Sequence, residues 1–146
     1  MVKRYFDVNV FVYYLIDDPE FGNRAEYWIE HTDEIYTSEI TFFQLIVVLK
    51  YLTKEDEKEI MRKISEVFDG LNVKFVHLEP YELKEVYETI KRNNLDFEDA
   101  IHYYCSRKIN AEMISNDSDL KSLERNFNPT LFKIKGEDLI VVVVSS

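Results

Sequence analysis

Cysteine and histidine are scarce in this chain of 146 residues. Cys105 is the only cysteine, so an intramolecular disulfide is impossible. The three histidines, at positions 31, 77 and 102, are far apart and do not have the spacing of a zinc site. The sequence therefore excludes a disulfide framework and contains no recognisable zinc motif.

Glycine and proline are also rare, with three of each, which argues against a low-complexity or disordered chain. Hydrophobic residues make up 46% of the sequence and aromatic residues 14%, enough for a core rich in aromatic rings. The length is that of one ordinary domain, and we expect a single domain over residues 1–146.

Long apolar runs are missing as well. The first residues, MVKRYFDVN, lack the apolar segment of a signal peptide, and no run reaches the length of a membrane helix. The apolar tail LIVVVV at 139–144 is too short to span a bilayer and is typical of a buried or edge strand. We therefore expect a cytoplasmic protein with no membrane contact.

Acidic residues outnumber basic ones by 28 to 18, which gives a formal net charge of −10. Such a charge repels nucleic acid at long range, so taken alone it indicates a protein without a polyanionic partner. Acids that cluster around a bound cation would reverse the local sign. The net charge thus leaves both interpretations open.

The chain alternates β-rich runs with helical patterns. The long apolar run at 40–52 predicts a buried helix, and a further helix is expected to begin at Thr53, with Asp56 in a capping position, and to end at Gly70. Strands separated by helices imply a parallel sheet with helices on both faces, an α/β sandwich of three layers. The predicted strands lie at 3–8, 34–38, 72–78, 111–115 and 130–134.

Three carboxylates are predicted to meet at one edge of this sheet. Asp7 ends the first strand, Asp117 follows the strand at 111–115, and Asp99 lies in the first turn of a helix at 97–108. Carboxylates brought together raise one another's pKa and cost stability unless a cation relieves the repulsion. Because Mg²⁺ and Mn²⁺ prefer oxygen ligands, the pattern indicates a divalent metal site formed by these three acids.

Each acid also has a purely structural interpretation. Asp117 is placed to cap a helix at 118–126, and Asp99 is placed to be the capping-box partner of Asp96. Asp7 can be a solvated strand end, although a charge inside the apolar run YFDVNVFV is costly to bury without a partner. The sequence alone leaves these alternatives open.

Four segments, in this order, resemble the motifs of PIN-domain nucleases and most of all those of VapC-type toxin ribonucleases: FDVNVFVYYLI, YTSEITFFQLIVVLKYL, LDFEDAIHYYCSRK and AEMISNDSDL. The match spans residues 4–120. The resemblance implies a Rossmann-like parallel sheet, hydrolysis of RNA with Mg²⁺ or Mn²⁺, and metal binding by Asp7, Asp99 and Asp117. It also implies a homodimer and a small antitoxin bound in an apolar groove. The aromatic run YFDVNVFVYY and the tail LIVVVV are candidate surfaces, with core burial as the alternative.

The resemblance assigns supporting roles and shows one departure. Asn9 and Ser115 match polar positions that orient the acids, and Asp119 matches a position that is often acidic. The family usually carries a glutamate in the helix after the second strand, where this chain has Gln44, so the site loses one negative charge. Glu39, five residues earlier, can replace it only if that helix starts late and the chain bends inward.

The leading hypothesis is therefore a metal-dependent ribonuclease that cleaves RNA with an activated water molecule. A first alternative is a PIN fold that binds RNA or protein and cleaves poorly because of Gln44. A second is an aspartate-based phosphatase, since DVN resembles the DxD motif of that class with Asn9 in place of the second aspartate.

Overall fold

The computed structural model describes residues 1–115 and 140–142. The helix predicted at 118–126 and the strand predicted at 130–134 lie outside the described residues. Among those described, no helix combines the length and the apolar character needed to cross a membrane.

One five-stranded sheet organises the molecule, in the order β3-β2-β1-β4-β5. The first four strands in chain order pair in parallel, and β5 is antiparallel to β4 at the edge. The parallel sheet is confirmed, and the apolar tail contributes an edge strand. The strands are β1 (Lys3–Phe6), β2 (Glu34–Ser38), β3 (Lys74–Val76), β4 (Glu112–Ser115) and β5 (Ile140–Val142).

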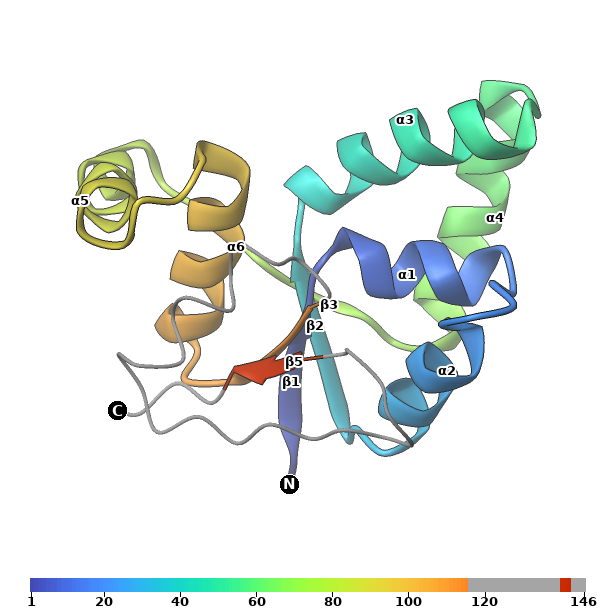
Figure 1. The fold of residues 1–146 in the computed structure, drawn as a ribbon, viewed down its shortest axis with the longest axis horizontal. Coiled ribbons are helices and arrows are strands. Elements are labelled where there is room, and N and C mark those ends of the chain that lie inside the picture. The colour runs from blue at the N-terminus through green and yellow to red at the C-terminus, as the bar shows by residue number, and fades with distance from the viewer. Residues whose placement is uncertain (116–139, 143–146) are drawn as a thin grey trace.

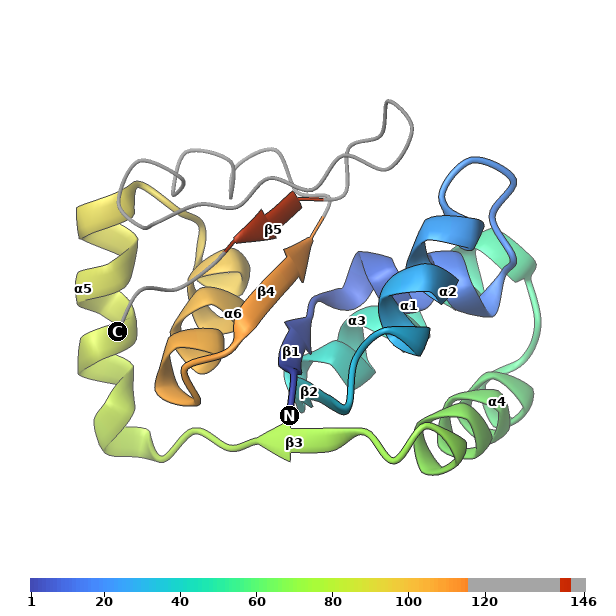
Figure 2. The same cartoon turned by 90° about the horizontal axis from the view of Figure 1, so that it is seen from below.

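Helices cover both faces of this sheet, as Figures 1 and 2 show. One layer contains α1 (Val8–Leu15), α2 (Gly22–Glu30), α3 (Ile40–Thr53) and α4 (Glu57–Gly70). The other contains the short helix η1 (Pro80–Glu82), α5 (Leu83–Asn93) and α6 (Phe97–Lys108). The predicted three-layer α/β sandwich is thus confirmed.

Neighbouring residues of β1 face opposite layers, because side chains alternate along a strand. Phe6 packs in the core beneath α1–α4, whereas Tyr5 packs with Ala100 and Tyr103 in the core beneath α5 and α6. The same alternation turns the next side chain, that of Asp7, toward the layer of α5 and α6.

The register of β1 and β4 brings their carboxyl ends to one level. Phe6 pairs with Ile114, and the backbone N–H of Asp7 donates to the Ile114 carbonyl at 3.3 Å. Asp7 and Ser115, the next residues along, therefore lie side by side at the edge where the starts of α1, α3 and α6 also gather (Figure 1).

The prediction that the run at 40–52 is buried is only half correct. Its helix, α3, buries Thr41, Leu45 and Leu49 but leaves Phe43 and Val47 at 72% and 69% exposure. These residues fall on opposite sides of the helix, and only one side meets the sheet layer. The helix is therefore buried on one side and exposed on the other, although most residues on both sides are apolar.

The predicted start of the next helix is wrong. Thr53 is the last residue of α3, and its hydroxyl donates to the Leu49 carbonyl at 2.7 Å. Lys54 then adopts a left-handed conformation that ends the helix, and Asp56 caps α4 by accepting from the Glu59 N–H at 2.9 Å. Gly70 is the last residue of α4 and not its cap.

Candidate metal-binding site

Asp7 sits where β1 becomes α1, and it is buried, with 3% of its surface exposed. Its Oδ1 accepts from the backbone N–H of Asn9 at 3.0 Å, which caps α1. Its Oδ2 accepts a hydrogen bond from the Ser115 hydroxyl. The interpretation of Asp7 as a solvated strand end is therefore wrong, since both of its carboxylate oxygens are held inside the protein.

Asp99 lies in the first turn of α6 and is 7% exposed. Asp96 caps this helix by accepting from the Asp99 N–H at 2.9 Å, as the spacing predicted. The cap is thus made by the side chain of Asp96 and the backbone of Asp99, and the Asp99 carboxylate is buried close to the helix start.

A buried contact between β1 and α6 indicates how Asp7 and Asp99 are placed relative to each other. The Tyr5 hydroxyl lies 2.6 Å from His102 Nδ1. Tyr5 comes two residues before Asp7 and so shares its face of the strand, while His102 comes three residues after Asp99, one helical turn along. The contact therefore places Asp7 and Asp99 in the same layer and at the same end of the sheet.

Of the predicted supporting residues, Ser115 is fully buried and orients Asp7 through its hydroxyl. Asn9 orients the same carboxylate, but through its backbone N–H. Asp117 and Asp119 lie outside the described residues, so their part in the site stays a prediction.

Gln44 is held between two residues of α6. Its Oε1 lies 2.8 Å from His102 Nε2, and its amide nitrogen donates to Glu98 at 3.2 Å. Glu39, in contrast, is exposed and its carboxylate contacts the His77 ring. Because α3 begins directly after Glu39, with helical backbone already at that residue, Glu39 does not take the place of Gln44.

A model of the PIN domain matches residues 4–126. The chain belongs to the PIN-domain family. PIN domains are typically magnesium-dependent nucleases, and the family generally uses divalent metal ions. No curated protein sequence matches the chain.

A solved structure shares the fold. It is a chain from the crystal structure of VapBC2 from Rickettsia felis bound to a DNA fragment from their promoter. The TM-score is 0.59 at 14% sequence identity, over 82% of this chain and 92% of that chain. At this identity the likeness supports the PIN-like fold and leaves the activity of this chain to be tested.

The described part of the candidate site fits a hard divalent cation. Asp7 and Asp99 supply carboxylate oxygens from buried positions, which favours Mg²⁺ or Mn²⁺ over metals that prefer nitrogen or sulfur. Within residues 1–115 and 140–142, no group of three or more His, Cys, Asp or Glu side chains is placed to hold a metal ion. A complete site therefore needs a further ligand, and Asp117 is the predicted one.

Sequence reasoning missed the residues that hold Gln44. His102, Tyr5 and Ser38 are buried and linked by hydrogen bonds of 2.6 and 2.7 Å through the Tyr5 hydroxyl. The available signal was the position of His102 on the same helical face as Asp99. Cys105 lies in the same core, and burial raises the pKa of its thiol to about 12, so it is not a nucleophile at neutral pH.

Proposed function

We propose that this PIN domain is a metal-dependent endoribonuclease, with Mg²⁺ or Mn²⁺ held by Asp7, Asp99 and Asp117. The observation that carries the proposal is the burial of two carboxylates, Asp7 and Asp99, in one layer at the carboxyl edge of a parallel sheet. Buried acids at this edge are costly to keep ionised, and a divalent cation offsets that cost.

The residues around Asp7 prepare it for this role. Ser115 and the Asn9 N–H each donate to one of its oxygens, which fixes the plane of the carboxylate. A bound divalent ion supplies an acidified attacking water and stabilises the charge that develops on the RNA phosphate.

The test is cleavage of single-stranded RNA with Mn²⁺ by the wild type and by Asp7→Asn. We expect Asp7→Asn to lose more than about 100-fold in rate, because it removes a ligand charge at the centre of the site. Asp69→Asn is the matched control, since Asp69 is exposed on α4 and far along the chain from the acids. Equal cleavage by wild type and Asp7→Asn rejects the assignment.

A weakened enzyme is the second candidate, because the Oε1 of Gln44 is hydrogen-bonded to His102 at a position where the family carries an acid. The site then has one carboxylate fewer for its metal. Gln44→Glu distinguishes the two candidates: a gain of more than about tenfold in Mn²⁺ affinity or cleavage indicates a weakened site. A wild type that already cleaves at the rate of Gln44→Glu supports the full enzyme.

We further propose that this chain, as one domain over residues 1–146, acts in the cytoplasm as the toxin of a toxin–antitoxin pair and forms a homodimer. The family resemblance and the VapBC2 structure support this proposal. The aromatic run at 5–14 does not offer the partner surface, because Tyr5, Phe6, Val10 and Phe11 are buried in the core. Light scattering of the purified protein tests the dimer.

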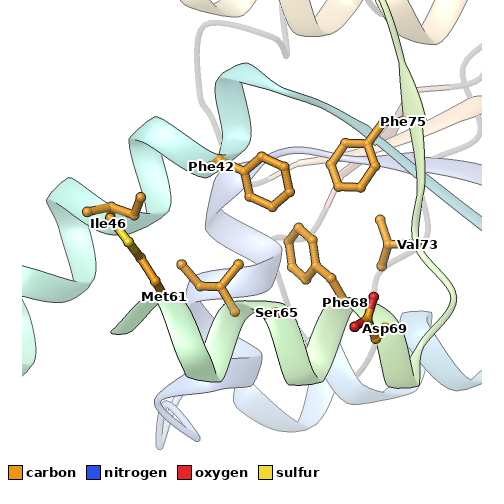
Figure 3. Close-up of a pocket in the computed structure, with 9 residues that line it drawn as sticks. Phe42, Ile46, Met61, Ser65, Phe68, Asp69, Val73 and Phe75 are labelled. Atoms are coloured by element: carbon orange, nitrogen blue, oxygen red, sulfur yellow. The ribbon is translucent and has the colours of Figure 1, made fainter. Parts of the chain in front are cut away.

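An apolar pocket of about 320 Å³ between α3 and α4 is the surface we propose for the antitoxin. Figure 3 shows the rings of Phe42, Phe68 and Phe75 gathered at it, with Met61 at the opposite side. An apolar side chain of a partner helix or strand fits such a pocket. We expect Met61→Glu to weaken binding of a candidate antitoxin by more than about tenfold in calorimetry, and Tyr81→Glu, an exposed site elsewhere, to leave it unchanged.

A further inference from the structure

Gln44 is the single glutamine of the sequence and lies beside the proposed metal site. It lines an open groove of about 480 Å³ between α3 and the start of α6, together with the exposed rings of Phe43 and Phe97. Figure 1 shows the first turns of α3 and α6 facing each other at the carboxyl edge of the sheet. A ligand in this groove can therefore reach the Gln44 amide.

The two neighbours of this amide determine which way it faces. The Glu98 carboxylate only accepts, so the group 3.2 Å from it is the amide NH₂. The carbonyl oxygen then faces His102 Nε2 at 2.8 Å, where an amide oxygen can only accept. A reversed amide would set its oxygen against the Glu98 carboxylate, which is repulsive.

The His102 ring is itself held in place by hydrogen bonding on the side away from Gln44. Its Nδ1 is hydrogen-bonded to the Tyr5 hydroxyl, which is also bonded to Ser38 Oγ, and all three residues are buried. Rotation of the His102 ring would break hydrogen bonds at both ring nitrogens inside the core, which is unfavourable. The Gln44 carbonyl is therefore anchored to the interior and its NH₂ is turned to the groove.

We propose that Gln44 binds a phosphate oxygen of the RNA strand through this NH₂, and that His102 is the positioning residue that turns it outward. The proposal rests on the proposed ribonuclease function. The amide oxygen, the only atom of the side chain that suits a divalent cation, is engaged by His102. The NH₂ already holds an anionic oxygen of Glu98, and amide donors are common phosphate contacts in nucleic-acid complexes.

Glu98 competes with the strand for this donor. Its side chain is exposed, so the carboxylate can move into solvent when a phosphate takes its place. Until it moves, its charge repels the phosphate. We expect Glu98→Gln to raise the affinity for single-stranded RNA about two- to fivefold in EDTA, and Glu26→Gln, an exposed acid on α2, to change it less.

The direct test uses the fact that Gln44 is unique. Selective ¹⁵N-glutamine labelling gives one side-chain amide pair in the NMR spectrum. With EDTA present, so that no cleavage occurs, we expect both amide signals to shift as a short single-stranded RNA is added and to saturate together with binding measured by fluorescence anisotropy. The His102 Nε2 hydrogen should be observed in the free protein.

The positioning role of His102 has its own readout. We expect Gln44→Leu and His102→Leu each to lower RNA affinity about three- to tenfold, and the double variant to lose no more than either alone, since both remove the same donor. Mn²⁺ affinity should stay within about twofold in Gln44→Leu because no ligand is lost. Thermal unfolding checks that each variant is folded.

Several results overturn this inference. The inference is overturned if the Gln44 amide signals do not move while RNA binds. It is also overturned if the losses of RNA affinity in the two single variants add in the double variant. A third contrary result is a Gln44 amide signal that shifts with protein concentration in the absence of RNA. This result would assign the groove to a contact between two copies of the chain. The inference is also overturned if the protein does not bind single-stranded RNA. Failure of the proposed function is distinguishable, because it appears as Mn²⁺ titrations that are alike in the wild type and Asp7→Asn.

Discussion

The two cores on either side of the sheet are built from different chemistry. Beneath α1–α4, rings and aliphatic side chains pack together, with Phe11 at 4.7 Å from Phe68 and 6.0 Å from Phe6, ring centroid to centroid. Beneath α5 and α6, the core includes Tyr5 and is crossed by its hydrogen bonds to His102 and Ser38. The second core therefore carries a buried network of side-chain hydrogen bonds through Tyr5 among its apolar residues.

The difference follows from the alternation along β1. Phe6 faces the apolar core, whereas Tyr5 and Asp7 face the α6 layer, where Asp99 and His102 also lie. Buried carboxylates need neighbours that donate hydrogen bonds, and these neighbours cost less next to other polar groups than within an apolar core. We therefore expect variants in the two cores to affect different properties.

The largest effect on stability should come from the apolar core. Phe11 is fully buried, and Phe11→Ala leaves a cavity among the rings, so we expect a loss of about 3–5 kcal/mol in the free energy of unfolding. Urea denaturation measures it. Phe43→Ala is the control, because Phe43 is exposed and should cost far less. Similar losses in both would contradict the assigned packing.

A smaller loss is expected from the polar core. Tyr5→Phe keeps the ring and removes the hydroxyl that serves both His102 and Ser38, leaving buried polar groups without this partner. We expect about 1–3 kcal/mol by the same urea measurement. Tyr81→Phe, at an exposed position, should change stability little. A neutral Tyr5→Phe would mean that this network does not contribute to folding.

The next effect concerns the site and not the fold. Ser115→Ala removes the donor to Asp7 Oδ2 and frees the carboxylate to turn, so we expect Mn²⁺ affinity to fall about tenfold in calorimetry. Ser65→Ala on the exposed side of α4 is the matched control. Unchanged Mn²⁺ affinity in Ser115→Ala would show that Asp7 needs no orientation, or that it is not a ligand.

Local signals explain how much of this architecture was predictable. The helix at 97–108 and the strand at 34–38 agree with α6 and β2 residue for residue. Asp96 marks the first boundary as a cap, and the polar residues around the strand mark the second. The start of α4 was predicted too early, at Thr53, because Lys54, the residue in the left-handed conformation that ends α3, is not one of the usual signals for a helix end.

The site was predictable in part. Asp7 and Asp99 are placed by strand ends and helix starts, which a sequence reveals, and their shared layer follows from the alternation of β1. The bonds from His102 to Tyr5 and Gln44 join residues 97 and 58 positions apart, and periodicity carries no information on such pairs. The sequence likewise leaves the role of Glu39 open, whereas the structure places its carboxylate against the His77 ring.

The smallest predicted effect is a pH-dependent ion pair at the far end of the polar core. Lys108, at the end of α6, lies 2.9 Å from the Glu82 carboxylate, and this contact is the main reason that the pKa of Glu82 is lowered from its ordinary value of 4.5. The Glu79 N–H donates to the same carboxylate at 2.7 Å. A lowered pKa means that the ionised form is favoured by the folded state.

The sign of the pH effect follows from this shift. The contribution of Glu82 is fully present above its unfolded pKa and is lost as the pH falls through its folded pKa, which lies below 4.5. We expect Glu82→Gln to be less stable than the wild type by under about 1 kcal/mol at pH 7, because Lys108 is partly exposed. Urea titrations at a series of pH values should show this difference shrinking toward pH 3, whereas Glu88→Gln, exposed on the same α5 layer, should show no such trend. A difference that persists at low pH would assign the stabilisation to the packing of the Glu82 side chain instead of to its charge.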